Sequence, residues 1–120
     1  MTYQKDVGAW GEAVACAYLK SQGYKIIDQN FYTRYGEIDI ICSQVERIVF
    51  VEVKTRTSTS YGLPEDSITE NKKQHLLNAA LLYLEEHPEL MEWEFDLLTI
   101  EGKYLSLNPT ITHFRNAIVE

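Results

Sequence analysis

Two acids and a lysine interrupt apolar sequence in this chain. Asp39 lies within the run IDII, and Glu52 and Lys54 lie within IVFVEVK. Two neighbouring carboxylates in a partly buried place repel each other unless a positive charge lies between them. Lys54 supplies part of that charge, and Mg²⁺ (or Mn²⁺) would supply more, since such cations bind one or two carboxylates and keep waters and phosphate oxygens. Because a metal so held activates water and stabilises charge on phosphorus, these residue types indicate phosphodiester hydrolysis.

This chemistry requires the three side chains to meet. Side chains alternate along a strand, so Glu52 and Lys54 share one face, ~6.6 Å apart at ~3.3 Å per residue. A hairpin about the polar turn at 43–46 would bring Asp39 opposite Glu52, with the backbones ~4.5–5.5 Å apart. The alternative is that Glu52 and Lys54 form a solvated pair on an exposed strand face, which is common in antiparallel sheets. Alternation also predicts the two faces of the preceding strand: Ile38, Ile40 and Cys42 on one, and Glu37, Asp39 and Ile41 on the other.

Glu12 is a further candidate, on a predicted helix. Its neighbours three and four residues away are all small and uncharged, namely Gly8, Ala9, Ala15 and Cys16. Glu12 therefore has no ion-pair partner along the helix, and small neighbours allow close packing against another element. We expect Glu12 to reach the same cluster. Alternatively, it is an ordinary surface glutamate near a helix N-terminus.

The first half of the chain reads as a helix followed by three strands. The helix has an apolar stripe at three- and four-residue spacing and stops at Gly23; the stripe consists of Val7, Trp10, Val14, Ala17 and Tyr18. Runs rich in β-branched residues predict strands at 24–31, 37–43 and 47–56. The last two strands flank a short polar stretch, which favours a hairpin.

The second half begins with a polar loop through Gly62 and Pro64. Ser67 and Glu70 resemble a capping box, which would open a helix that Pro88 ends. Strands at 92–100 and 103–109 and a short helix at 111–118 are expected to follow. The resulting order, α-β-β-β-α-β-β, predicts an α/β fold in which helices flank a mixed β-sheet.

Composition limits the class of protein. The 120 residues have an ordinary globular composition without repeats or linkers, so we expect a single domain covering 1–120. No apolar run approaches the ~18 residues of a membrane span, and the N-terminus does not resemble a signal peptide. Cys16 and Cys42 match no metal-ligand spacing, and scattered His75, His87 and His113 are expected at a helix surface or core edge. We expect a cytoplasmic protein with no membrane partner.

The net charge of −7 argues against a nucleic-acid partner, but the charge is unevenly distributed. Residues 85–120 hold eight acids and two bases, whereas residues 1–84 hold ten acids and nine bases. The near-neutral part contains the residues that would form a local basic patch for phosphates, namely Lys54, Arg56, Lys72 and Lys73.

Three segments in this order resemble the PD-(D/E)xK nuclease superfamily: a helix with Glu12, GEIDII with Asp39, and FVEVKTR with Glu52 and Lys54. More closely, the chain resembles the archaeal Holliday-junction resolvases and the bacterial YraN-type family, whose members are often described as endonucleases. The likeness covers most of the chain, from GxxGExxA at 8–15 to the predicted second helix. The extended pattern GEIDII…FVEVKTR is its most specific part.

The resemblance implies a restriction-endonuclease-like fold with defined roles for these residues. Asp39, Glu52 and the carbonyl of Val53 would bind the metal, Lys54 would be the catalytic lysine, and Glu12 would assist the metal or its water. The DNA-binding residues implied or expected are Arg34, Arg56, Lys72 and Lys73. One departure is Tyr32, which stands where relatives often have a basic residue.

The function that follows is a metal-dependent endonuclease that hydrolyses branched or otherwise structured DNA. The resolvase analogy also implies a homodimer, since two strands would be cut symmetrically. The alternative is a non-catalytic module that retains the nuclease fold and binds nucleic acid or a protein. The negative net charge favours a protein partner, whereas the intact set of two acids and a lysine favours the enzyme.

Overall fold

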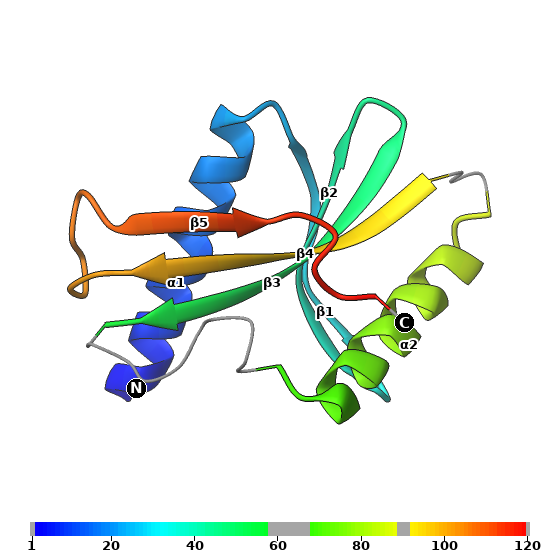
Figure 1. Cartoon of the computed structure of the whole chain (residues 1–120), viewed down its shortest axis with the longest axis horizontal. Helices are drawn as coiled ribbons and strands as arrows, with labels where there is room; N and C mark the ends of the chain where they lie inside the picture. The colour runs from blue at the N-terminus through cyan, green and yellow to red at the C-terminus, as the bar shows by residue number, and fades with distance from the viewer. Residues whose placement is uncertain (1, 58–67, 89–91, 120) are drawn as a thin grey trace.

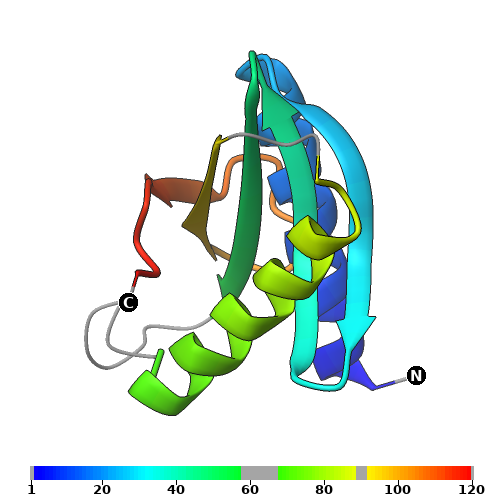
Figure 2. The ribbon, with the colours of Figure 1, turned by 90° about the vertical axis from the view of Figure 1, so that its right-hand side faces the viewer.

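The computed structural model describes residues 2–57, 68–88 and 92–119. Five strands form one sheet in the order β1-β2-β3-β4-β5, with bounds Lys25–Thr33, Gly36–Gln44, Arg47–Arg56, Glu92–Glu101 and Thr110–Phe114. Strands β3 and β4 pair in parallel, and the other pairs are antiparallel. Helix α1 (Tyr3–Ser21) and helix α2 (Glu70–Glu85) lie on opposite faces of the sheet (Figures 1 and 2). The predicted α/β class, mixed sheet and element order are confirmed.

The sheet buries an apolar cluster on each face. The cluster beneath α2 includes Phe50, Phe95 and Leu97, and the cluster beneath α1 includes Val49, Val51 and Leu98. Strand β3 supplies both clusters because it is central, and residues 48–52 of it are all buried. This buried run ends in a charged residue, Glu52, which is 4% exposed.

The face that α1 turns to the sheet includes most of the predicted stripe, since Val7 is buried and Trp10, Val14 and Tyr18 pack against the cluster beneath α1. Ala17 is exposed, and the buried residues are Val7, Gly11, Ala15, Cys16 and Leu19. A Cβ atom added to Gly11 would lie 1.9 Å from the Thr55 Oγ1 atom, so α1 approaches β3 at a distance that requires glycine. The predicted stop at Gly23 is confirmed, since α1 ends at Ser21 and Gly23 has φ +91°.

Two predictions near the C-terminus are wrong. The last strand is β5 at Thr110–Phe114 rather than 103–109, and it occupies much of the segment expected to be helical. Residues 103–109 connect β4 to β5; Leu105 there has φ +65°, far from the extended backbone of a regular strand, and Leu107 is 95% exposed. The alternation of apolar residues over 103–109 predicted a strand, but the Leu105 and Leu107 side chains are exposed rather than packed in a core.

The start of α2 also differs from the prediction. Thr69, rather than the predicted Ser67, is the N-cap, and its Oγ1 atom accepts a hydrogen bond from the Lys72 N–H at 3.1 Å. The helix ends at Glu85, shortly before Pro88, as expected. Most of the predicted polar loop and Ser67 itself lie outside the described residues.

A buried network attaches β5 to the rest of the fold. Asp96 of β4 is fully buried and accepts hydrogen bonds from the His113 Nε2 atom at 2.7 Å and the Asn116 N–H at 2.8 Å. The other ring nitrogen of His113 is 3.1 Å from the Tyr18 hydroxyl of α1. His113 is thus a core-edge residue, and its hydrogen bonds join α1, β4 and β5. None of the helices in the described part of the chain is long and apolar enough to cross a bilayer.

Candidate functional site

Asp39 lies where the pairing of β2 with β3 stops. The last paired residues are Ile40 and Val51, and just beyond them the Val53 N–H donates a hydrogen bond to the Asp39 Oδ2 atom at 2.8 Å. A carboxylate thus bridges two strands at the point where their ladder ends. From this position between the strands it neighbours Glu12 and Glu37 on one side and Glu52 on the other.

The side-chain alternation of β2 changes at the same point. Ile38 and Ile41 both pack in the cluster beneath α2, whereas Ile40 packs beneath α1. The prediction that Ile38 and Ile40 share a face is therefore wrong. The neighbouring strand carries a matching irregularity, since Asn30 of β1 has φ +53°, a conformation that asparagine tolerates better than most residues.

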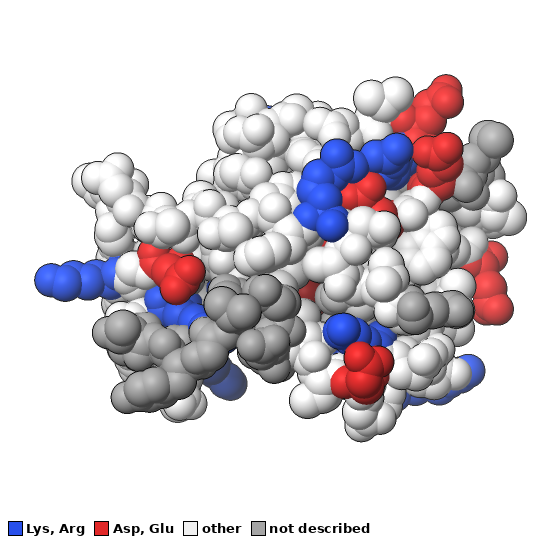
Figure 3. Space-filling model, in the orientation of Figure 1, with Lys and Arg blue, Asp and Glu red and all other residues white. Residues whose placement is uncertain are grey.

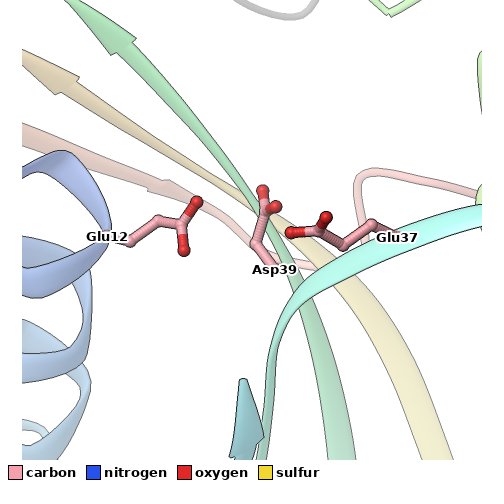
Figure 4. A group of neighbouring side chains, drawn as sticks. All are labelled: Glu12, Glu37 and Asp39. Atoms are coloured by element: carbon pink, nitrogen blue, oxygen red, sulfur yellow. The ribbon is translucent and has the colours of Figure 1, made fainter. Parts of the chain in front are cut away.

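On the α1 side of the sheet, three carboxylates converge. One oxygen each of Glu12, Glu37 and Asp39 lies within 4.8 Å of the others, and we call these residues the carboxylate cluster. Glu12 reaches in from α1, Glu37 from β2, and the Asp39 carboxyl lies between them (Figure 4). The Asn30 side-chain amide donates to Glu12 Oε1 at 3.0 Å and to Glu37 Oε1 at 2.6 Å.

On the α2 side, Glu52 is surrounded by cations. Its Oε2 atom lies 3.7 Å from the Lys54 Nζ atom and 3.6 Å from the Lys72 Nζ atom. The Glu52 carboxylate also lies close enough to Asp39 to raise the pKa of Asp39, so Asp39 links Glu52 to the other acids of the carboxylate cluster. The predicted meeting of Glu12, Asp39, Glu52 and Lys54 therefore occurs in the fold.

The site carries more negative charge than its two lysines neutralise. Burial and the neighbouring Glu52 carboxylate raise the pKa of Asp39 to about 8. Burial also raises the pKa of Glu12, with Glu37 and Glu52 adding to the effect. At neutral pH and without a cation, Asp39 therefore holds a proton, which allows it to donate a hydrogen bond to Glu52.

This pKa predicts how stability depends on pH. At pH values between the unfolded pKa of Asp39, near 4, and its folded pKa, Asp39 carries a proton in the folded metal-free protein but not in the unfolded chain. Folding therefore takes up a proton, and the free energy of unfolding falls as the pH rises through this range. An Asp39→Asn variant keeps the acceptor for the Val53 N–H without the charge. We expect its stability relative to wild type to increase by about 1–3 kcal/mol between pH 5.5 and 8.5.

Urea unfolding in EDTA at both pH values measures this effect. Asp28→Asn, at an exposed position in β1, is the matched surface control. An Asp39→Asn variant that gains nothing over wild type at the higher pH would contradict the close burial of Asp39 against a second carboxyl group.

The donor set fits a hard divalent cation. All the side-chain donors of the carboxylate cluster are oxygens, as Mg²⁺ and Mn²⁺ prefer, and the raised pKa of Asp39 reflects an unbalanced negative charge that a cation would offset. Asp39 belongs both to this cluster and to the ligand set implied by the resemblance. Glu52, the second implied ligand, lies beside the cluster and pairs with lysines.

The expected DNA-binding residues lie in different places. Lys72 contacts Glu52, whereas Lys73 pairs with Glu70 at 3.5 Å on α2. Arg34 lies at the β1–β2 turn, with its guanidinium 4.8 Å from the centre of the Tyr35 ring, and Arg56 ends β3. On the face in Figure 3, lysines and arginines of the described residues lie beside acids rather than in one broad basic patch.

Two residues of the site were missed by sequence reasoning. Glu37 carries a detectable signal, since it stands two residues before Asp39 in the same strand, the spacing that places side chains on one face. Asn30 carries none, because its role depends on the left-handed conformation that aims its amide between Glu12 and Glu37.

Comparison with known proteins identifies the family. A family profile described as "Uncharacterised protein family UPF0102" matches residues 11–100. A UPF0102 protein of Syntrophomonas wolfei is 48% identical over 117 residues, which cover 94% of this chain and 97% of that protein. UPF0102 proteins of Syntrophotalea carbinolica and Geobacter metallireducens are each 40% identical, covering 86% and 96% of this chain and 85% and 93% of those proteins.

The chain therefore belongs to the UPF0102 family, which is the YraN-type family that its sequence resembles. Residues 11–100 run from Gly11 in α1 to Ile100 in β4, and so include Glu12, Asp39 and Glu52.

Proposed function

We propose that residues 1–120 act as one nuclease-like domain that hydrolyses phosphodiester bonds in DNA with the help of Mg²⁺ or Mn²⁺. The observation that supports this proposal most directly is the position of Asp39. Its carboxyl group belongs to the carboxylate cluster and also neighbours Glu52, which pairs with Lys54 and Lys72. A purely structural site would gain nothing from gathering four acids around a single point.

In this proposal Asp39 holds the cation, together with Glu12, Glu37 and Glu52 as direct or water-mediated ligands and with the carbonyl of Val53. A bound cation would supply Lewis-acid stabilisation of the phosphate and lower the pKa of a water. Lys54 orients the attacking water or neutralises charge that develops on the phosphate oxygens. Asn30 fixes the rotamers of Glu12 and Glu37 through its amide.

Branched or structured DNA is the proposed substrate and a homodimer the proposed assembly, both from the resemblance to resolvases, and the cytoplasm is the proposed location. The net charge of −7 and the intermixed surface charges leave little long-range attraction for a polyanion. Binding would then depend on contacts near the site, for which Arg34, Arg56, Lys72 and Lys73 are the candidates.

Cleavage of four-way junctions, flaps, single strands and duplexes with Mg²⁺ or Mn²⁺ tests this function. Asp39→Asn is the null variant, because it keeps the hydrogen bond to Val53 and loses the ligand charge. We expect wild type to cut at least one branched substrate and to bind Mn²⁺ in calorimetry, and the variant to do neither. A matched null variant also excludes contaminating nucleases.

The non-catalytic alternative gives a different result. A binding module would bind DNA or a protein without cutting, and its affinity would not depend on a divalent cation. Equal Mn²⁺ heats from wild type and Asp39→Asn would rule out the proposed metal site, and metal-dependent binding without cleavage would rule out the enzyme.

A further inference from the structure

Lys72 is not an ordinary surface cation of α2. Its Nζ atom lies 3.6 Å from the Oε2 atom of Glu52, the same oxygen that Lys54 approaches at 3.7 Å. Glu52 is 4% exposed, so this pairing brings a charge from a separate element to an almost buried carboxylate. Burying the Glu52 carboxylate costs desolvation free energy, and two ammonium groups offset more of this cost than one exposed ion pair would.

The position of Lys72 in its helix is locally unfavourable. It lies in the first turn of α2, where its backbone N–H donates to the N-cap Thr69. The positive end of the helix dipole disfavours cations there, and the adjacent Lys73 reduces this cost by pairing with Glu70. Lys72 instead has its partner in β3. Helix stability therefore does not explain a lysine at this position.

The two lysines that pair with Glu52 differ in how freely their side chains can move into solvent. Lys54 is two residues from Glu52 in β3, and its side chain is 31% exposed. The Lys72 side chain is 47% exposed and extends from a different element, so it is able to turn toward solvent while its helix stays in place. A divalent cation near Asp39 and Glu52 would repel both ammonium groups, and Lys72 is the one that can leave.

We propose that Lys72 is an exchangeable counter-ion of the site, which holds Glu52 in the metal-free protein and binds a non-bridging phosphate oxygen of DNA in the metal-loaded protein. This inference rests on the proposed function and deepens it. Lys72 is a positioning residue toward Glu52 in the first state and a substrate contact in the second. DNA binding is thereby coupled to metal binding.

The proposal predicts effects of opposite sign on metal and DNA. Without DNA, Lys72→Gln removes a cation that repels the metal, so Mn²⁺ should bind about 3- to 10-fold more tightly in calorimetry. With Ca²⁺ in place of Mg²⁺ to limit cleavage, the same variant should bind a fluorescent branched oligonucleotide about 3- to 10-fold more weakly. A merely structural lysine would not tighten metal binding.

Two variants complete the design. Lys73→Gln removes the same charge one residue away, from a lysine paired with Glu70, and should leave Mn²⁺ affinity unchanged. Lys72→Arg keeps the charge and should retain both wild-type affinities to within about twofold. Thermal unfolding of each variant checks that the fold is intact.

The outcomes separate the inference from the function beneath it. If Lys72→Gln bound Mn²⁺ no more tightly than Lys73→Gln does, the proposed exchange of Lys72 would be overturned, whereas the proposed metal site would stand. Unchanged DNA affinity in Lys72→Gln would likewise overturn it. A wild-type protein that binds no Mn²⁺ would overturn both this inference and the proposed function.

Discussion

Lys54→Met is expected to reduce cleavage by about 10²- to 10⁴-fold, the range found when a group that moves protons or stabilises charge is removed. The ammonium group lies 3.7 Å from Glu52 but is not itself a candidate metal ligand. Mn²⁺ should therefore still bind, at wild-type affinity or tighter. The loss should appear in kcat under saturating substrate and metal, and single-turnover cleavage measures it directly.

The control for Lys54→Met is Lys103→Met, an identical substitution at an exposed lysine in the β4–β5 connection. It should cleave at the wild-type rate. If Lys54→Met lost Mn²⁺ binding together with activity, Lys54 would be a support for Glu52 rather than a participant in the reaction. If it kept full activity, the lysine assignment would be wrong, and Lys72 would be the remaining cation on Glu52.

Gly11→Ala is expected to destabilise the protein by about 2–3 kcal/mol, although alanine is the better helix former. The new methyl group would lie 1.9 Å from Thr55 Oγ1 and 2.9 Å from Thr55 Cβ, so α1 has to move away from β3. Glu12 is the next residue and moves with the helix. Urea unfolding and Mn²⁺ calorimetry should therefore both report weakening.

The matched control for Gly11→Ala is Gly8→Ala, three residues earlier in the same helix. Among the described residues, no atom outside the adjoining helix backbone lies within 4 Å of a Cβ added there. This variant should be neutral or more stable by up to about 1 kcal/mol, with unchanged Mn²⁺ affinity.

Adding Thr55→Ala to Gly11→Ala removes the clashing hydroxyl and should restore part of both properties. Equal stabilities of the two glycine variants would contradict the close approach of α1 to β3. Loss of stability without loss of Mn²⁺ affinity would remove Glu12 from the site.

The two large predictions concern different parts of one arrangement. In the proposed mechanism Lys54 acts on the substrate from just beyond the buried run of β3, whereas Gly11 sets how far Glu12 reaches from α1. Both substitutions affect the surroundings of Asp39. The pairing of β2 with β3 ends beside Asp39, and acids from α1, β2 and β3 lie near its carboxyl group there. A small fold thus gathers acids from a helix and two strands with only five strands and two helices in the described residues.

Most of the elements were predictable because their causes are local. The β-branched runs of β2 and β3 and the glycine after α1 determine backbone conformation within a few residues. The last strand was misplaced because Leu105 and Leu107 alternate like a strand but have no core to cover them. The N-cap of α2 was misplaced by two residues, since Ser67 and Thr69 are equally able to accept a backbone hydrogen bond.

The sequence by itself determined the acids, the lysine and their spacing, and so the family and the kind of chemistry that we propose. Tertiary structure alone decided that Lys72 reaches Glu52, that Asn30 turns its amide between Glu12 and Glu37, and that alternation changes at Asp39. These features depend on contacts between elements far apart in the chain. Hydrophobic periodicity records only which face of an element is buried, and not what it meets there.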